Sequence, residues 1–144
     1  MATGLQVVFD CADPQRMAAF WSEAIGYQVQ PPPEGFATWD DFLTSIGVPE
    51  DAFNSASAIT DPDGSGPRVF FQQVAEHKTT KNRVHLDLNV GGGRETQFEV
   101  RRTRVDAEAE RLSAIGAITV RSYEENGEYW VAMLDPEGNE FDLQ

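Results

Sequence analysis

Apolar and polar residues alternate strictly between Arg83 and Val90. One set of alternate positions is apolar: Val84, Leu86, Leu88 and Val90. The other set is polar: Arg83, His85, Asp87 and Asn89. A period of two predicts a strand with one face against a core. The polar face resembles the lining of a cleft, but an exposed strand can carry the same row by chance, so the pattern alone leaves both interpretations open.

The start of the chain repeats this pattern. In Gln6–Cys11, Val7, Phe9 and Cys11 alternate with Gln6, Val8 and Asp10. Gln6 takes the place of His85, and Asp10 comes close to the place of Asp87 or Asn89. A second strand with a polar face at the matching place favours the cleft interpretation.

An amphipathic helix follows the first strand. Asp13 and Pro14 are a typical N-cap and first helical residue. Bulky apolar residues then recur at helical spacing, at Met17, Phe20, Trp21, Ala24 and Ile25. Gly26 ends the helix, and a strand over 27–30 completes a βαβ unit.

The remainder of the first half contains an insertion and two strands. The insertion covers about 34–55, with a short helix over 40–46 and the aromatic residues Trp39, Phe42 and Phe53. We favour the interpretation that this insertion is a lid that covers a cleft. The alternative is that it covers the edge of a sheet. Strands over 57–60 and 68–74 flank a turn at 61–66. Residues 76–82 form a polar connector.

The second half repeats this order of elements. After the strand at 83–90, the pattern predicts a loop over 91–103 and a helix carried by Val105, Ala109, Leu112 and Ile115. Strands follow over 117–123, 128–134 and 140–144, with Asn126-Gly127 as a hairpin turn. Tyr129 and Trp130 alternate, so one faces a cleft and the other the helix, and the pattern does not say which.

Short sequences repeat at matching places in the two halves. Ala24-Ile25-Gly26 matches Ala114-Ile115-Gly116, and Asp61-Pro62-Asp63-Gly64 matches Asp135-Pro136-Glu137-Gly138. These matches predict an internal duplication. The predicted fold is α+β, with two tandem βαβββ modules at 5–74 and 83–144 that form curved mixed sheets around a cleft, in one domain over 1–144.

Composition narrows the classes of partner. The net charge is −13, so nucleic acid and anionic membrane surfaces are not expected partners. No apolar run approaches the ~20 residues of a membrane span. The single cysteine, Cys11, excludes an internal disulfide and predicts a reducing, cytoplasmic location. Its alternation with Val7 and Phe9 predicts a buried side chain.

The duplicated βαβββ order and the Asp-Pro-x-Gly turn before each closing strand resemble the vicinal oxygen chelate superfamily, which contains glyoxalases, bleomycin resistance proteins and extradiol dioxygenases. The segments 78–88 and 134–143 resemble its glyoxalase-like branch. The resemblance covers nearly the whole chain apart from the insertion. It implies a homodimer and a cleft built from the opening and closing strands of both modules.

In the metal-dependent members, His or Gln from the opening strands and carboxylates from the closing strands hold a divalent metal. The resemblance assigns Gln6, His85 and Asp142 to these positions. The matching position of the first half falls at Phe70, or at best Gln72, and neither is a carboxylate. We therefore expect no tightly held metal and no other cofactor; if a divalent metal is bound, its ligands are Gln6, His85 and Asp142.

The predicted function is binding of a small organic molecule in the cleft between the modules. The predicted cleft residues are Gln6, Asp10, Phe70, Gln72, His85, Asp87, Trp130 and Asp142. Two alternatives stay open. The first is a divalent-metal-dependent lyase or isomerase of the glyoxalase type, in which the catalytic residue is His85. The second is sequestration of a drug or metabolite, for which the acidic charge favours a cationic ligand.

Overall fold

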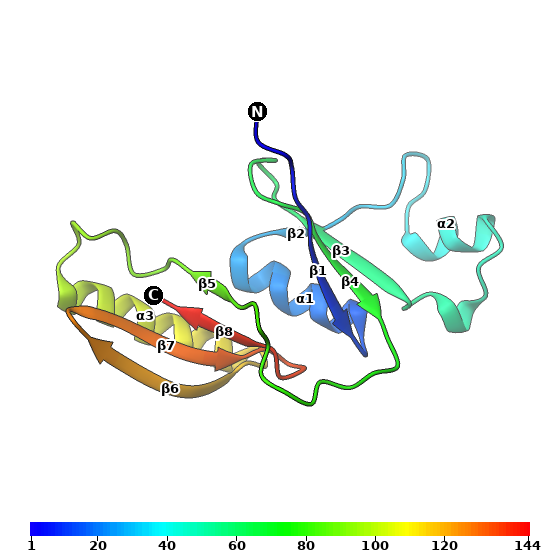
Figure 1. Cartoon of the computed structure of the whole chain (residues 1–144). Coiled ribbons are helices and arrows are strands. Elements are labelled where there is room, and N and C mark those ends of the chain that lie inside the picture. Colours follow the sequence, from blue (N-terminus) through cyan, green and yellow to red (C-terminus); the bar gives the residue numbers. More distant parts are fainter. The chain divides into compact units, whose positions relative to one another are not determined.

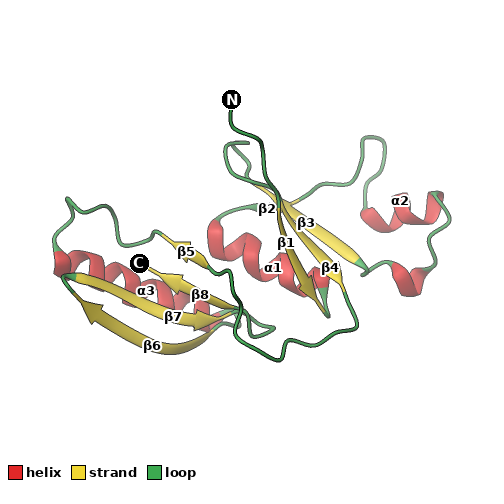
Figure 2. Cartoon of the chain, in the orientation of Figure 1, coloured by secondary structure: helices red, strands yellow, loops and turns green.

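The computed structural model describes residues 1–144. The chain divides into two compact units, Met1–His77 and Lys78–Gln144. Each unit is a βαβββ module with one four-stranded mixed sheet, so the fold is α+β, as predicted (Figure 2). None of its helices combines the length and the apolar character that a membrane crossing needs.

The first unit places its opening and closing strands side by side. Its sheet has the order β1-β4-β3-β2 (Figure 1). The β1–β4 pair is parallel and the other pairs are antiparallel. The elements are β1 (Val7–Cys11), α1 (Pro14–Ile25), β2 (Gln28–Val29), α2 (Trp39–Ser45), the 3₁₀ turn η1 (Glu50–Ala52), β3 (Ala56–Thr60) and β4 (Val69–Gln73).

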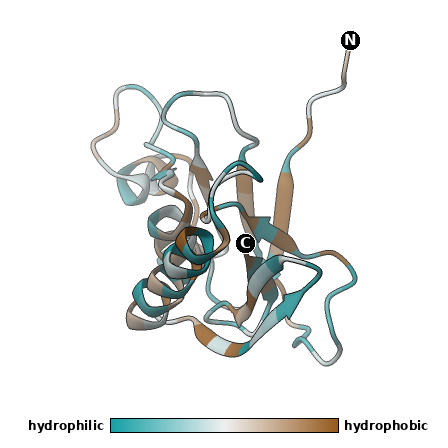
Figure 3. Cartoon of the chain, turned by 90° about the vertical axis from the view of Figure 1, so that its left-hand side faces the viewer, coloured by the Kyte–Doolittle hydropathy of each residue, from teal (hydrophilic) through white to brown (hydrophobic).

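Helix α1 packs its apolar face on this sheet. The Asp13 carboxylate accepts a hydrogen bond from the Arg16 N–H at 3.1 Å, and Gly26 ends the helix with a φ of 73°. Met17 and Trp21 are fully buried, together with Phe71 of the sheet. Figure 3 shows the resulting pattern, with loops largely hydrophilic and apolar segments within helices and strands.

The second unit has the same topology. Its sheet has the order β5-β8-β7-β6, with a parallel β5–β8 pair and antiparallel neighbours. The elements are β5 (Leu86–Leu88), α3 (Phe98–Ala114), β6 (Ile118–Glu125), β7 (Glu128–Leu134) and β8 (Glu140–Leu143). Val105 and Leu112 of α3 are buried with Phe141 and Leu143 of the closing strand. The opposite face of the sheet carries no helix of this unit.

In the Asp-Pro-x-Gly turns of both units, the aspartate carboxylate accepts the N–H groups of the residues two and four positions later. The Asp61 carboxylate accepts the N–H groups of Asp63, Ser65 and Gly66 at 2.7–3.1 Å. The Asp135 carboxylate accepts the N–H groups of Glu137 and Asn139 at 2.9 and 3.0 Å. Gly64 and Gly138 have φ values of 70° and 85°. Each aspartate therefore organises the turn that starts the closing strand.

Three predicted element bounds were wrong. The strand expected over 83–90 is regular only at Leu86–Leu88, where β8 pairs with it, and Val84 is 80% exposed. The helix expected near Val105 begins at Phe98, because the basic residues assigned to a loop are good helix formers. Strand β6 continues to Glu125, so the hairpin turn is tighter than predicted.

Candidate functional site

His85, Asp87 and Asp142 come together on the open face of the second sheet. The parallel β5–β8 ladder pairs Asp87 with Asp142, which brings the two carboxylates side by side. His85 lies two residues before Asp87 and therefore points to the same face. Its Nε2 atom lies 3.2 Å from an Asp87 oxygen and 3.6 Å from an Asp142 oxygen. One ligand atom from each residue fits within a span of 4.8 Å.

Asp142 is the most enclosed member of this His85 cluster. Its side chain is 24% exposed, compared with 41% for His85 and 43% for Asp87. Burial raises the pKa of Asp142 above its ordinary value, and the Asp87 charge adds to this effect. Nearby His85 and Lys81 oppose the rise in that pKa without cancelling it. The Asp142 carboxyl group therefore holds a proton to a higher pH than an ordinary aspartate.

An open hollow of about 650 Å³ lies beside the cluster. Asp87, Asp142 and Trp130 line it, and so do the loop residues around Gly92. Asn89 and Gln144 also line the hollow, and the Gln144 side-chain amide donates a hydrogen bond to the Asn89 side-chain oxygen at 2.9 Å. Arg101 also lines the hollow, and its ion pair with Glu128 at 2.9 Å neutralises the charge of its guanidinium. The lining of the hollow thus combines carboxylates, amides, two arginines (Arg94 and Arg101) and two aromatic residues (Tyr129 and Trp130).

Trp130, rather than Tyr129, is the aromatic residue on the open face. Its ring stacks on Tyr123, with centroids 5.1 Å apart and planes inclined by 10°. Tyr129 is 9% exposed and donates a hydrogen bond to Asp106 of α3 at 2.5 Å. The stacked Trp130–Tyr123 pair offers a flat surface for a ring-shaped ligand.

The other predicted site residues lie in the first unit. Asp10 and Gln72 pair across the β1–β4 ladder. The Gln6 side-chain oxygen accepts a hydrogen bond from Arg68 at 2.7 Å, and the Arg68 guanidinium lies 5.2 Å from the centre of the Phe70 ring. The structure therefore gathers the eight predicted residues into two groups, one in each unit.

The ladders explain why only the second unit has a cluster of ligand atoms. If Gln6 corresponds to His85, the parallel pairing makes Val8 the counterpart of Asp87 and Phe70 the counterpart of Asp142. Both carboxylates are thus replaced by apolar side chains. The only group of three His, Cys, Asp or Glu residues that could hold a metal is the His85 cluster.

Sequence reasoning missed some features of the site. It did not predict that Asp87, rather than a residue of the first module, is the second carboxylate beside His85. The signal was present, because alternation puts His85 and Asp87 on one face. Tyr123 and Arg68 were also missed, because nothing local in the sequence shows what each side chain contacts.

A family model described as "glyoxalase-like domain" matches residues 6–144. No curated protein sequence matches the chain. Among solved structures, a glyoxalase/bleomycin resistance protein/dioxygenase family enzyme from Burkholderia phytofirmans has 20% identity and a TM-score of 0.61, over 96% of this chain and 94% of that one. A possible glyoxalase from Bacillus cereus has 14% identity and a TM-score of 0.61, over 100% and 99%.

A third similar structure contains ligands. It is a mutant of the fosfomycin resistance protein FosX from Listeria monocytogenes, complexed with Mn(II) and 1S,2S-dihydroxypropylphosphonic acid. It shares 13% identity with the chain, with a TM-score of 0.63 over 100% of this chain and 90% of that one. At these identities, the likeness establishes the fold and leaves the chemistry to the residues of this chain.

Proposed function

Because the chain belongs to the glyoxalase-like domain family, we propose that it binds a small organic molecule on the open face of its second sheet, beside His85. The observation that carries this proposal is the His85 cluster at the edge of a hollow of about 650 Å³. Asp87 and Asp142 would orient polar groups of the ligand, and Trp130 would contact its apolar part.

The same cluster supports a metal-dependent alternative. One imidazole nitrogen and two carboxylate oxygens within 4.8 Å form a donor set that suits a divalent transition metal. This set differs from the predicted Gln6, His85 and Asp142, because Asp87 replaces Gln6. A bound divalent metal would act there as a Lewis acid in a lyase or isomerase reaction.

Without a metal, His85 itself supplies acid–base chemistry. Its Nε2 atom lies within 3.6 Å of two carboxylate oxygens, which would hold the imidazole ring in a fixed orientation for proton transfer. A ligand with an acidic proton next to a carbonyl, placed in the hollow, would be a suitable substrate. In either enzyme, Trp130 and Asn89 would hold the substrate rather than take part in bond changes.

Sequestration is supported by a different observation. The stacked Trp130–Tyr123 pair lies on the face that also carries Asp87 and Asp142. A flat organic cation would stack on the indole while its charge faced the carboxylates. The net charge of −13 favours a ligand of this sign.

Two properties of the whole protein belong to the proposal. A homodimer would cover the exposed apolar residues of the open sheets, among them Val8, Ile118 and Val120. The single cysteine, Cys11, is buried, and we infer a cytoplasmic location because a chain with one cysteine can form no internal disulfide.

The test is a parallel titration with metals and with small molecules. Metal content of the protein purified without chelator is measured first. Thermal stability is then recorded with Mn²⁺, Co²⁺, Ni²⁺ and Zn²⁺, and with a panel of α-hydroxy ketones and aromatic cations. His85→Ala is compared with wild type, and His77→Ala is the control, because His77 lies exposed in the connector of the first unit.

Each outcome identifies one candidate. Stabilisation by organic molecules alone, lost in His85→Ala and kept in His77→Ala, supports the leading proposal. Bound metal near one per chain, lost only in His85→Ala, supports the metal-dependent enzyme. Turnover of a bound ligand separates an enzyme from sequestration. If neither metals nor organic molecules distinguish His85→Ala from wild type, the His85 site is not the functional site.

A further inference from the structure

The insertion at 34–55 is fixed to the first module at both of its ends. Near its start, the Trp39 indole N–H donates to the Gln30 backbone carbonyl at 2.7 Å. Near its end, the Asn54 side chain accepts the Gln15 N–H at 2.9 Å and donates to the Asp13 carboxylate at 2.8 Å. These bonds hold the segment against helix α1 and strand β2, so the space beneath it is preformed.

A largely apolar cavity of about 370 Å³ lies between this segment and the sheet. It forms there because β2 pairs with β3 only at Ile59 and Thr60, which leaves the rest of the β3 edge without a strand beside it. Its apolar lining consists of Ala18, Val29, Trp39, Leu43, Phe53, Ala56, Ala58 and Phe70. The volume is in the range of small-molecule sites.

Arg68 is the only charged residue that lines the cavity. Its Nε and Nη1 atoms donate to the side-chain oxygens of Gln30 and Gln6, both at 2.7 Å, and its guanidinium lies over the Phe70 ring. All these partners are neutral. None of the ion pairs of the chain includes Arg68, although the chain has 24 acidic residues against 11 basic ones.

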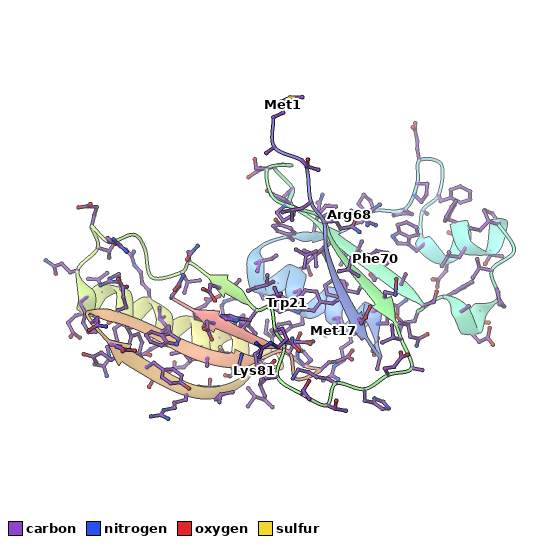
Figure 4. The ribbon with its side chains drawn as sticks, in the orientation of Figure 1. Met1, Met17, Trp21, Arg68, Phe70 and Lys81 are labelled. Carbon is purple, nitrogen blue, oxygen red and sulfur yellow. The ribbon has the colours of Figure 1, made fainter.

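The position of Arg68 is therefore defined while its charge is not neutralised. Two hydrogen bonds to amides and one ring contact orient the guanidinium just before strand β4, next to Phe70 (Figure 4). A guanidinium forms its strongest contacts with a planar carboxylate. An apolar cavity that ends at such a group matches a molecule with an apolar body and one carboxylate.

We propose that this cavity, here named the Arg68 cavity, binds a small apolar monocarboxylate, with the carboxylate on Arg68 and the apolar body between Phe70 and Trp39. All residues of this cavity belong to the first unit, and none of them is a member of the His85 cluster. The apolar lining disfavours phosphate esters, because their charge of about −2 would need more cationic partners than Arg68 alone.

The test uses phenylacetate and 4-methylpentanoate as probes, with phenylacetamide as the neutral analogue of the first. Binding is measured by titration followed in NMR spectra, because the Trp39 indole N–H at the cavity gives its own signal. Arg68→Gln keeps hydrogen-bonding capacity and removes the charge. Arg121→Gln is the matched control, an arginine stacked on Tyr123 in the second unit. Ala56→Leu fills the cavity while leaving Arg68 in place.

The expected result is saturable movement of the Trp39 signal with both carboxylates. Loss of a charge-assisted contact predicts about tenfold weaker carboxylate binding in Arg68→Gln. Arg121→Gln should bind as wild type does, phenylacetamide should bind weakly to every variant, and Ala56→Leu should not bind either carboxylate.

Three outcomes would overturn the proposal. The first is no movement of the Trp39 signal at millimolar carboxylate. The second is equal carboxylate affinity in wild type and Arg68→Gln. The third is an equal loss in Arg121→Gln, which would show general attraction to positive charge. A result at Trp39 says nothing of the His85 site, whose own readout is the comparison of His85→Ala with His77→Ala.

Discussion

Asp142 and Glu140 lie two residues apart on strand β8, and their environments shift their pKa values in opposite directions. Burial raises the pKa of Asp142, and Asp87 raises it further. Burial also acts to raise the pKa of Glu140, but hydrogen bonds from the Asn82 N–H and from Lys78 outweigh it, so the pKa of Glu140 is lowered. Removing the Asp142 charge and removing the Glu140 charge should therefore change the stability at pH 7 in opposite directions.

For Asp142→Asn, we expect greater stability than wild type at pH 7. A raised folded-state pKa means that protonated Asp142 contributes stability at pH values below the unfolded value near 3.8, and that this contribution is lost as pH rises through the folded pKa. The amide imitates the protonated form, so the gain should disappear towards pH 4. Urea unfolding between pH 4 and 8, followed by the Trp130 indole signal, measures it.

Glu140→Gln is the matched substitution with the opposite expectation. Its lowered folded-state pKa contributes stability above the unfolded value of 4.5, and that stability is lost as pH falls through the folded pKa. Glu140→Gln should be less stable than wild type at pH 7, with a difference that narrows in acid. The same sign for both substitutions would contradict the environments described for these carboxyl groups.

Asp135 illustrates how burial changes the importance of the same turn residue. It is 1% exposed and accepts the N–H groups of Glu137 and Asn139. Asp135→Ala would leave these donors without an acceptor, and we expect a loss of about 2–3 kcal/mol in the free energy of unfolding of the second unit. Asp61→Ala in the first unit is the control, and should cost less because water reaches that turn. Equal losses in urea unfolding would contradict this account.

At the scale of elements, helix α3 shows why part of the fold could not be predicted from the sequence. Its N-cap residue, Gln97, makes no side-chain capping hydrogen bond, so the local start signal used for α1 at Asp13 is missing. Its first turns hold Arg101 and Arg102, which look like loop residues when read alone. Arg101 instead bonds to Glu128 and to the Gly127 carbonyl of the β6–β7 hairpin. That tertiary contact is invisible in a local pattern.

The missing cap leads to a prediction for this helix. The backbone of Gln97, with φ −57° and ψ 142°, is not helical, and this conformation suits a capping side chain. Gln97→Ser should accept a free N–H of the first turn and raise the free energy of unfolding of the second unit by about 1 kcal/mol. Gln97→Ala offers no acceptor and serves as the control. Equal stability of the two variants in urea unfolding would refute the expected cap.

The strands show the opposite case, in which sequence patterns predicted the arrangement. Alternation assigned His85, Asp87 and Asn89 to one face of a strand, and the structure brings the first two together with Asp142. The register between β5 and β8 decides which carboxylate meets which imidazole. Register depends on pairing between strands about 55 residues apart in sequence. The alternation therefore predicts which face of the strand each side chain occupies, but not which side chains of the neighbouring strand lie beside it.

At the scale of the whole molecule, the duplication was predictable because its signals are local and occur twice. Two helices that end in Ala-Ile-Gly and two Asp-Pro-x-Gly turns in the same order indicate two copies of one module. The two sheets, with orders β1-β4-β3-β2 and β5-β8-β7-β6, confirm that prediction. The cavity beneath the insertion was not predictable in the same way, because nothing in the second module resembles that segment.

Association of two chains is the prediction at this scale. Val8 is 50% exposed, Ile118 is 59% exposed and Val120 is 56% exposed, and β6 is a long strand at the edge of its sheet. Such surfaces are usually covered by another chain. We expect sedimentation velocity to give a mass near twice the 16.0 kDa of the chain at micromolar concentration. A monomer at 100 μM would contradict the homodimer.

The matching ladders have a consequence for protein engineering. Val8 and Phe70 of the first module occupy the positions that Asp87 and Asp142 occupy in the second module. The first module therefore carries apolar side chains where the second module carries carboxylates. The first module could therefore receive the His85 cluster by substitution. Gln6→His, Val8→Asp and Phe70→Asp together would rebuild that cluster on a backbone whose opening and closing strands already have the matching pairing.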